Sequence, residues 1–252
     1  MESNIVNPSL LSVVIPVYNE VATIGVVIEE LAKIPYLLEI VAVNDGSKDG
    51  TQTVLNRLAQ EYPQLKVIHH SKNKGKTMAL KTGFRQTKGN IVIVQDADLE
   101  YNPQEIFEVI SPILEEKADV VYGSRFLVRK AARVLYFSHY LANKFLTFLS
   151  NCLTNLNMTD VETCYKAFRG EIIRSMVIES QGFGFEIEVT AKVSKLKCRI
   201  YEVPISYYGR TYEEGKKIGI WDGVSAMWYI AYYNLFCPLK KSFSSLPFDY
   251  MK

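Results

Sequence analysis

The stretch "NIVIVQDADLEY", residues Asn90–Tyr101, decides how the first half of the chain is expected to fold. Four branched apolar residues, 91–94, run directly into three carboxylates, Asp96, Asp98 and Glu100. A short continuous apolar run is typical of a parallel strand that is covered on both faces. If the chain stays extended beyond the run, alternate residues share a face, so the three carboxylates would point to one side. Carboxylate oxygens suit a hard divalent cation, so we expect Mg²⁺ or Mn²⁺ there rather than a solvated loop.

The same pattern of apolar runs and helical spacing extends from residue 11 to residue 123. Strands are expected at 11–17, 39–45, 66–70, 90–96 and 119–125, and helices at 22–34, 51–62, 75–87 and 102–117. Thr51 and Asn102 are expected as N-caps, with Pro103 at the first helical position. The pattern predicts an α/β fold, with a mostly parallel central sheet and helices on both faces.

Polar clusters follow four of the predicted strands, at 18–20, 44–50, 95–100 and 123–125. Ligands of such sheets bind beyond the carboxyl ends of the strands, so these clusters are expected to form the binding edge. Asp45 directly follows its strand, and its carboxylate could accept from ribose hydroxyls or base N–H groups. Neither a G-x-G-x-x-G fingerprint nor a P-loop motif is present, which argues against both kinds of phosphate loop.

The second half is less regular, and we expect it to complete one domain rather than form another. A long amphipathic helix is expected at 132–153, a turn and short strand within 159–170, a helix at 186–196 and an extended segment at 198–207. The predicted division is an N-terminal tail (1–10), two halves of a single domain (11–130 and 131–219), and a C-terminal aromatic amphipathic segment with its tail (220–252).

Composition indicates a globular protein without a nucleic-acid partner. The 252 residues are 48% hydrophobic, and 29 basic against 27 acidic residues leave a net charge of +2. That charge is too small to favour nucleic acid. The four cysteines form no C-x-x-C pair, so reduced thiols in an intracellular protein are expected. Glu2 and Pro16 make the start a poor signal peptide, and we expect a cytoplasmic location.

Five segments in this order carry a resemblance to a known family: "SVVIPVYNE", "VNDGSKDGT", "NKGKTMALKTGF", "VQDADLEY" and "YGSR". The chain resembles the family 2 inverting glycosyltransferases of GT-A fold. Within these it is most similar to the dolichol-phosphate mannose synthase and polyprenyl-phosphate glycosyltransferase branch, over about residues 11–215. It departs from the usual pattern at Thr77 and Met78, where the family has smaller residues.

The resemblance implies a hexosyltransferase and assigns its site residues. Such an enzyme moves a hexose from GDP-mannose, UDP-glucose or UDP-GlcNAc to a polyprenyl or dolichyl phosphate, with help from Mg²⁺ or Mn²⁺. The half at 11–130 would bind the nucleotide sugar, and the half at 131–219 would bind the acceptor. The nucleotide would be held by Pro16, Tyr18, Glu20, Asp45 and Asp96, and the metal by Asp96, Asp98 and Glu100.

The acceptor determines whether a general base is needed. A lipid phosphate is already ionised and needs cations, and Arg125, Arg133 and Lys217 are the candidates. From the resemblance, Asp98, Arg125 and Arg210 are expected to act in catalysis. A hydroxyl acceptor would instead need a base, and the candidates are Asp160 and Glu162. The absence of Q-x-x-R-W argues against a polymerising synthase. A nucleotidyltransferase and a non-catalytic sugar-nucleotide binding module are weaker alternatives.

Two aromatic amphipathic stretches, 135–153 and 221–236, are of the type that lies in a membrane interface. Such stripes also occur in protein cores and dimer contacts. No stretch reaches the roughly 18 uncharged apolar residues of a spanning helix. Peripheral contact with the cytoplasmic face of a membrane, or with a membrane-anchored partner, is therefore left open beside packing within the protein.

Overall fold

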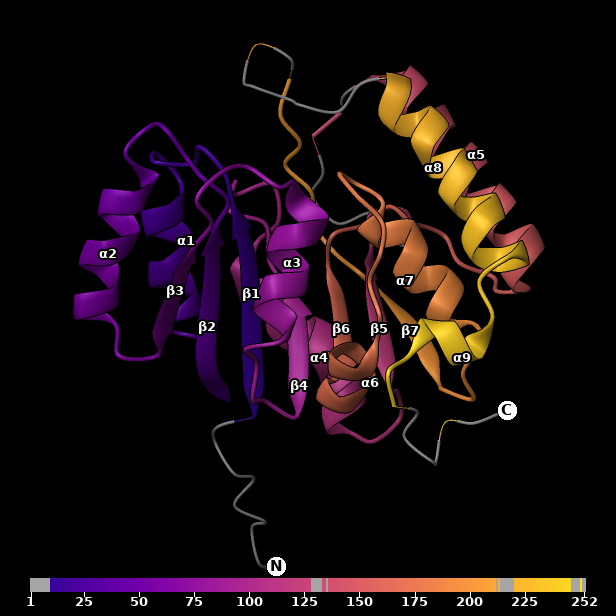
Figure 1. Cartoon of the computed structure of the whole chain (residues 1–252), viewed down its shortest axis with the longest axis horizontal. Coiled ribbons are helices and arrows are strands. Elements are labelled where there is room, and N and C mark those ends of the chain that lie inside the picture. Colours follow the sequence, from indigo (N-terminus) through magenta and orange to yellow (C-terminus); the bar gives the residue numbers. More distant parts are fainter. Residues whose placement is uncertain are drawn as a thin grey trace, which may run out of the picture.

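The structure, a computed structural model, describes residues 10–127, 133–134, 136–211, 213, 220–245 and 250. Seven strands of this part form one sheet in the order β3-β2-β1-β4-β6-β5-β7 (Figure 1). Strand β6 is antiparallel to β4 and β5, and the other neighbours are parallel. The strands are β1 (Leu11–Val17), β2 (Leu37–Asn44), β3 (Leu65–His69), β4 (Ile91–Val94), β5 (Val120–Ser124), β6 (Lys166–Arg169) and β7 (Ile200–Pro204). The predicted mostly parallel sheet is confirmed.

Helices cover both faces of the sheet, as predicted. The helices are α1 (Ile24–Leu31), α2 (Thr51–Glu61), α3 (Lys76–Phe84), the 3₁₀ turn η1 (Pro103–Glu105), α4 (Ile106–Leu114), α5 (Phe137–Thr154), α6 (Gly170–Ser175), α7 (Phe185–Val193), α8 (Ile220–Leu235) and α9 (Leu239–Ser242). Helices α3, α6 and α7 lie in front of the sheet in Figure 1. Phe84 of α3 packs on Phe185 of α7 with ring centroids 5.5 Å apart, so these two helices share a face.

Of the two predicted helix caps, one is confirmed and one is wrong. The Asn102 side chain accepts from the Gln104 N–H (3.1 Å), with Pro103 at the first position of the turn. Helix α2 instead begins at Thr51 itself, after Gly50 in a left-handed conformation (φ 92°). The Thr51 hydroxyl accepts from the Glu20 N–H (3.0 Å), and so it joins this helix to the loop after β1 instead of capping it.

The central strands are buried on both faces, which explains their unbroken apolar sequence. All four residues of β4 are buried, and so are Val13, Val14 and Ile15 of β1. Helix α3 approaches β1 closely at Gly83, where an added Cβ would lie 2.4 Å from the Cγ1 atom of Val14. Because this core is close-packed, it holds the carboxyl ends of the strands rigidly at the upper edge of the sheet in Figure 1.

At the opposite edge, Asp119 joins the ends of three strands. Its carboxylate accepts from Arg169 Nε (2.9 Å), from the Arg199 N–H (2.8 Å) and from Arg199 Nη2 (2.8 Å). Burial alone would favour the protonated carboxyl, but the bonds from Arg199 and Arg169 outweigh it and lower the pKa of Asp119 to about 2. Ionised Asp119 therefore stabilises the fold at neutral pH.

We expect Asp119→Ala to lower the free energy of unfolding at pH 7 by about 1–3 kcal/mol, since charged hydrogen bonds are lost. The contribution is present above the ordinary pKa of Asp, about 4, and disappears as the pH falls towards 2. Urea unfolding at a series of pH values measures the difference between wild type and variant. The control is Glu61→Ala, which removes an exposed pair with Arg57 and should change little. A difference of the same size at pH 3 and pH 7 would contradict this role.

Candidate active site at the carboxyl edge of the sheet

The chain turns after β4 and does not stay extended, so the expected row of carboxylates on one face is wrong. Leu99 has a φ of 59°, and the Glu100 N–H donates to Asp98 Oδ1 (3.2 Å). This bond from the backbone to an aspartate two residues earlier favours a turn over a continued strand. Asp96, Asp98 and Glu100 still stand together at the end of β4, but on a turn.

Arg210, from the segment after β7, lies among these carboxylates. Its Nη2 atom is 2.7 Å from Asp98 Oδ2, its Nη1 atom 3.4 Å from Glu20 Oε1 and its Nε atom 3.5 Å from Glu100 Oε1. The Arg210 N–H also donates to Glu100 Oε1 (2.7 Å), and the Tyr207 hydroxyl donates to Glu100 Oε2 (3.0 Å). The Arg210 guanidinium thus joins Glu20, which follows β1, to Asp98 and Glu100, which follow β4. These acids were predicted to lie at the same edge of the sheet.

The electrostatics of this turn fit a divalent cation. Burial, together with the charges of Asp96 and Glu100, raises the pKa of Asp98 to about 7, although Arg210 opposes the shift. The donors are carboxylate oxygens, which Mg²⁺ and Mn²⁺ prefer. Among the described residues, no three His, Cys, Asp or Glu side chains are grouped so that they could hold a metal ion. Asp96 is paired with Lys76 instead, and Asp98 with Arg210. The side chains of this turn are therefore of the type that binds Mg²⁺ or Mn²⁺, and metal binding by Asp96, Asp98 and Glu100 stays a prediction.

Lys76 and Glu186 belong to the same site, and sequence reasoning did not assign them. Lys76 opens α3, and its Nζ atom lies 3.0 Å from Asp96 Oδ1, 3.1 Å from Glu186 Oε1 and 3.5 Å from the Cys164 sulfur. The lysine of "NKGKTMAL" was a signal, since it was part of the family resemblance. Glu186 gave none, because it stands in a helix whose residues are all buried.

Asp45 lies at the predicted edge, but its carboxylate is already occupied by protein donors. It accepts from the Gly75 N–H (2.7 Å), from the Lys74 N–H (3.0 Å) and from His70 Nδ1 (2.6 Å), and the side chain is buried. It therefore shapes the loop that leads into α3. Direct contact of Asp45 with a nucleotide stays a prediction. The same holds for Pro16 and Tyr18, which are partly exposed at the end of β1.

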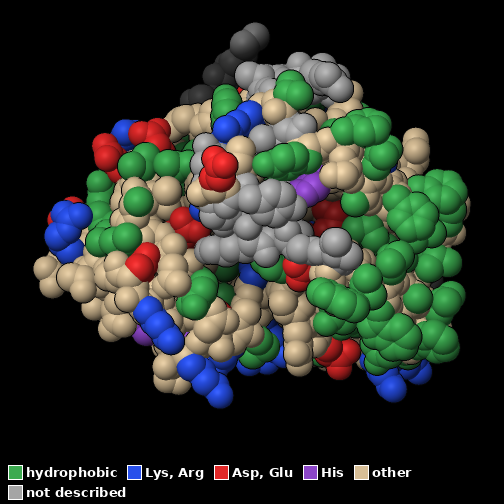
Figure 2. Space-filling view, turned by 90° about the horizontal axis from the view of Figure 1, so that it is seen from above, with side chains coloured by type: hydrophobic (Ala, Val, Ile, Leu, Met, Phe, Trp, Pro, Cys, Tyr) green, Lys and Arg blue, Asp and Glu red, His purple; other side chains and the backbone are tan. Residues whose placement is uncertain are grey.

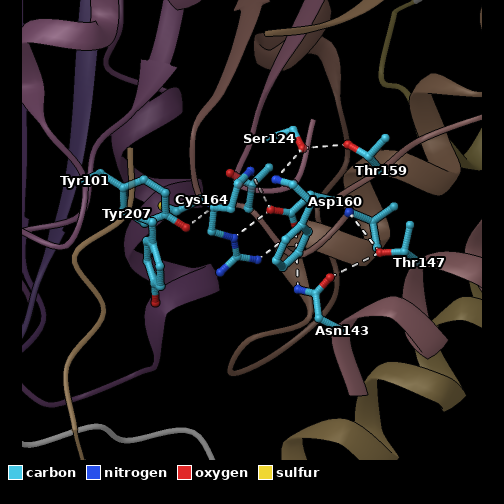
Figure 3. A network of polar contacts seen from close by, with 12 residues as sticks. Tyr101, Ser124, Asn143, Thr147, Thr159, Asp160, Cys164 and Tyr207 are labelled. Atoms are coloured by element: carbon cyan, nitrogen blue, oxygen red, sulfur yellow. Dashed lines mark hydrogen bonds and ion pairs between the residues drawn. The ribbon is translucent and has the colours of Figure 1, made fainter. Parts of the chain in front are cut away.

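Arg125 and Asp160 were predicted as separate functional groups, and the structure pairs them. Figure 3 shows the polar network around Asp160. Arg125 Nε lies 2.6 Å from Asp160 Oδ2, and Nη2 lies 2.7 Å from Oδ1. Asn143 of α5 also donates to Asp160 Oδ1 (3.3 Å), and the Tyr207 ring lies 5.0 Å from Arg125 Cζ. Burial would raise the pKa of Asp160, but Arg125 outweighs it and lowers the pKa. A buried carboxylate with a lowered pKa is poorly suited to act as a base.

Comparison with known proteins places this geometry in a family. The model of the glycosyl transferase family 2 matches residues 12–176, about two thirds of the chain. The chain is a family 2 glycosyltransferase. The resemblance seen in its motifs, including the polyprenyl-phosphate branch, is confirmed by its similarity to curated relatives.

Two relatives of this glycosyltransferase are named for transfer to polyprenyl lipids. An undecaprenyl-phosphate mannosyltransferase of Micrococcus luteus is 28% identical over 212 residues, 82% of this chain and 86% of that protein. A polyprenol monophosphomannose synthase of Mycolicibacterium smegmatis is 27% identical over 214 residues, 82% of this chain and 80% of that protein.

The solved structures show the same GT-A fold. Glucosyl-3-phosphoglycerate synthase of Mycobacterium tuberculosis, in complex with Mn²⁺, UDP and glucosyl-3-phosphoglycerate, has a TM-score of 0.67 and 19% identity. The match covers 90% of this glycosyltransferase and 80% of that chain. A second complex of that enzyme, with Mn²⁺, UDP and phosphoglyceric acid, has a TM-score of 0.69.

Glu162 of the glycosyltransferase differs from Asp160 in its surroundings. Burial, and next the charge of Glu186, raises the pKa of Glu162 to about 7. Its Oε1 atom is buried and has no hydrogen-bond partner among the described residues. Of the two candidate bases, Glu162 is therefore the one whose surroundings suit proton transfer.

The predicted acceptor-phosphate cations lie in two groups. Arg125 is engaged with Asp160, whereas Arg133 is exposed and reaches the segment that carries Arg210: its N–H donates to the Tyr207 carbonyl (3.0 Å) and its Nη1 to the Gly209 carbonyl (3.4 Å). Lys217 lies outside the described residues. Phosphate binding by Arg125, Arg133 and Lys217 stays a prediction.

Proposed function

We propose that this glycosyltransferase moves mannose, with inversion at C1, from a nucleoside-diphosphate mannose to a polyprenyl phosphate. The printed names of the two relatives support both the sugar and the acceptor. The observation that carries the proposal is the position of α5. Asn143 on α5 contacts Asp160 in the site, whereas Phe137, Phe145 and Phe148 of the same helix are exposed to solvent. An ionic site beside an exposed apolar face suits an acceptor with a phosphate head and an apolar tail.

Asp96, Asp98 and Glu100 would hold Mg²⁺ or Mn²⁺, in keeping with the Mn²⁺ and UDP of the solved neighbours. When bound, such an ion stabilises the negative charge that develops on a leaving diphosphate. Arg210 and Lys76 supply further positive charge at the same edge. The acceptor phosphate is ionised at neutral pH, so its oxygen can attack without a general base. Arg125 and Arg133 would orient it, together with Lys217.

Helices α5 and α8 form an apolar face that we propose as the membrane-docking surface. The two helices lie side by side (Figure 1), and Figure 2 shows apolar side chains gathered over them at the right of the molecule. The most exposed are Phe137, Phe145, Phe148, Trp221, Trp228 and Leu235. Trp, Tyr and Phe favour the boundary between lipid and water. Among the helices of the described residues, none is both long enough and apolar enough to cross a bilayer.

We expect the pair Phe148→Ser and Trp228→Ser to weaken vesicle binding at least tenfold, since each apolar side chain contributes about 1.5–3 kcal/mol when buried. Co-sedimentation with phosphatidylcholine–phosphatidylglycerol vesicles measures the effect. Val26→Ser on α1, which also replaces an exposed apolar residue, is the control and should bind as wild type does. Unchanged vesicle binding, with loss of a dimer in the double variant, would show instead that the face joins two copies of the chain.

Transfer of label tests the proposed function. Purified protein is incubated with Mn²⁺, a polyprenyl phosphate and radiolabelled GDP-mannose, UDP-glucose or UDP-GlcNAc. We expect label from the mannose donor to enter the organic phase and to depend on the polyprenyl phosphate. No label in the organic phase with any donor would overturn the proposal. Transfer to a soluble sugar hydroxyl, lost in Glu162→Gln, would favour the second candidate, in which Glu162 is the base.

A further inference from the structure

Three buried polar atoms close to the proposed donor site have no hydrogen-bond partner among the described residues: Glu162 Oε1, Thr163 Oγ1 and Glu186 Oε2. Buried polar groups are rarely left unpaired, because an unmade hydrogen bond costs about as much as removing the group from water. The two glutamates also repel, since the charge of Glu186 raises the pKa of Glu162. Such a cluster destabilises the protein alone and becomes favourable when a ligand supplies donors.

The neighbouring lysines do not satisfy these oxygens. Lys166 is fully buried, and its ammonium group donates to the carbonyls of Val161 and Thr163. Lys76 lies between Asp96 and the other carboxylate oxygen of Glu186, Oε1. The lysine ammonium groups of the cluster are therefore directed at other acceptors. Among the described residues, no donor reaches Glu162 Oε1 or Glu186 Oε2, so both oxygens can accept from a ligand.

We propose that Glu162 and Glu186 form a subsite that binds hydroxyl groups of the donor hexose. The inference rests on the proposed function. Two carboxylates repel a phosphate, so they do not suit the diphosphate or the acceptor head group. They accept strongly from O–H donors, and a hexose is a neutral ligand that carries several. The Thr163 hydroxyl can both donate and accept beside them.

The position of the cluster favours the sugar over other polyols. Lys76 links Glu186 directly to Asp96, at the edge where the nucleotide is expected. Asp96 and Lys76 are both partly exposed, so the cluster lies next to the solvent-accessible part of the edge. Glu186 stands in the first turn of α7, which Phe185 and Phe84 fix against α3. A rigid helix therefore holds the Glu186 carboxylate at a set distance from the turn that carries Asp96, Asp98 and Glu100, as selection among hexoses requires.

Equilibrium binding without acceptor tests this subsite. The affinities of GDP-mannose and of GDP are measured with Mn²⁺ for wild type, Glu186→Gln, Glu162→Gln and the control Glu171→Gln, which replaces an exposed glutamate on α6. We expect each subsite variant to bind GDP-mannose about 10- to 100-fold more weakly while GDP binding changes little. The thermal unfolding temperature of Glu162→Gln should stay the same or rise, because a repulsive charge is removed, whereas Glu186→Gln also loses its ion pair with Lys76 and should unfold at a similar temperature. The control should match wild type in every measurement.

Deoxy analogues locate the hydroxyls. GDP-mannose analogues lacking one hydroxyl should bind wild type more weakly, and at least one should lose no further affinity in Glu186→Gln or Glu162→Gln. Equal loss of GDP and GDP-mannose binding, or unchanged GDP-mannose binding in both variants, overturns the subsite while leaving the proposed function standing. If wild type binds neither GDP nor UDP with its sugars, both the subsite and the proposed function are wrong.

Discussion

Asp98→Ala is expected to abolish metal-dependent transfer, with a loss of about a thousandfold or more. The expectation rests on the metal contribution of several kcal/mol to the developing charge of the diphosphate. Asp98 stands between Asp96 and Glu100, and it is the carboxylate that the Arg210 guanidinium contacts most closely (2.7 Å). Initial rates of lipid labelling at saturating Mn²⁺ measure the loss.

The same change should not unfold the protein. The pKa of Asp98 is raised to about 7, which means that the folded state disfavours its ionised form. Ionised Asp98 therefore destabilises the folded state, by an amount that grows as the pH rises from about 4 to about 7. Asp98→Asn, which carries no charge, should unfold at the same or a higher temperature than wild type at pH 8. Glu29→Ala, at an exposed surface carboxylate, is the control and should keep full activity. Full activity in Asp98→Ala would remove the metal assignment.

Arg125→Ala is expected to lower the free energy of unfolding by about 3–5 kcal/mol, because it leaves the buried carboxylate of Asp160 without its ionic partner. Both bonds of the pair are short, at 2.6 and 2.7 Å, and Asp160 has no exposed surface. For a chain of this size the unfolding temperature should fall by roughly 10 °C. Thermal unfolding followed by circular dichroism measures it.

Two further variants separate the pair from a phosphate-binding role. Arg125→Lys keeps the charge but not the double hydrogen bond, so it should fall between wild type and Arg125→Ala. Combining Arg125→Met with Asp160→Leu should recover most of the stability, since apolar residues can replace a buried ion pair. If Arg125→Ala unfolds as wild type does and changes only the KM for the polyprenyl phosphate, the guanidinium serves the acceptor alone and the stabilising role of the pair is wrong.

Much of the sheet could be predicted because its signals are local. Strands buried on both faces leave continuous apolar runs, and β1, β2 and β4 were found from these alone. The insertion of β6 between β4 and β5 could not be predicted in the same way. It depends on pairings such as Val92 with Phe168 and Val120 with Phe168, which join distant parts of the chain.

The site shows the same division between local and distant signals. The acids at the end of β4 were visible because they follow an apolar run. The turn at Leu99 was not, since a left-handed leucine has no sequence signal of its own. The pairing of Arg125 with Asp160 spans 35 residues, and each looked like a free functional group until the fold joined them. Glu186 was missed because all residues of its helix are buried. The sequence alone does not show which side chains an acid in such a helix contacts, so it gives no sign that the acid belongs to the site.

The position of the cation with the donor diphosphate bound tests the central claim most directly. Crystals grown with Mn²⁺ and GDP, measured at a wavelength where manganese scatters anomalously, locate the ion. We predict a manganese peak beside Asp98 and the GDP phosphates, with Arg210 no longer paired to Asp98. A peak elsewhere, or GDP bound at this edge with the pair between Arg210 and Asp98 intact and no manganese, would contradict the account.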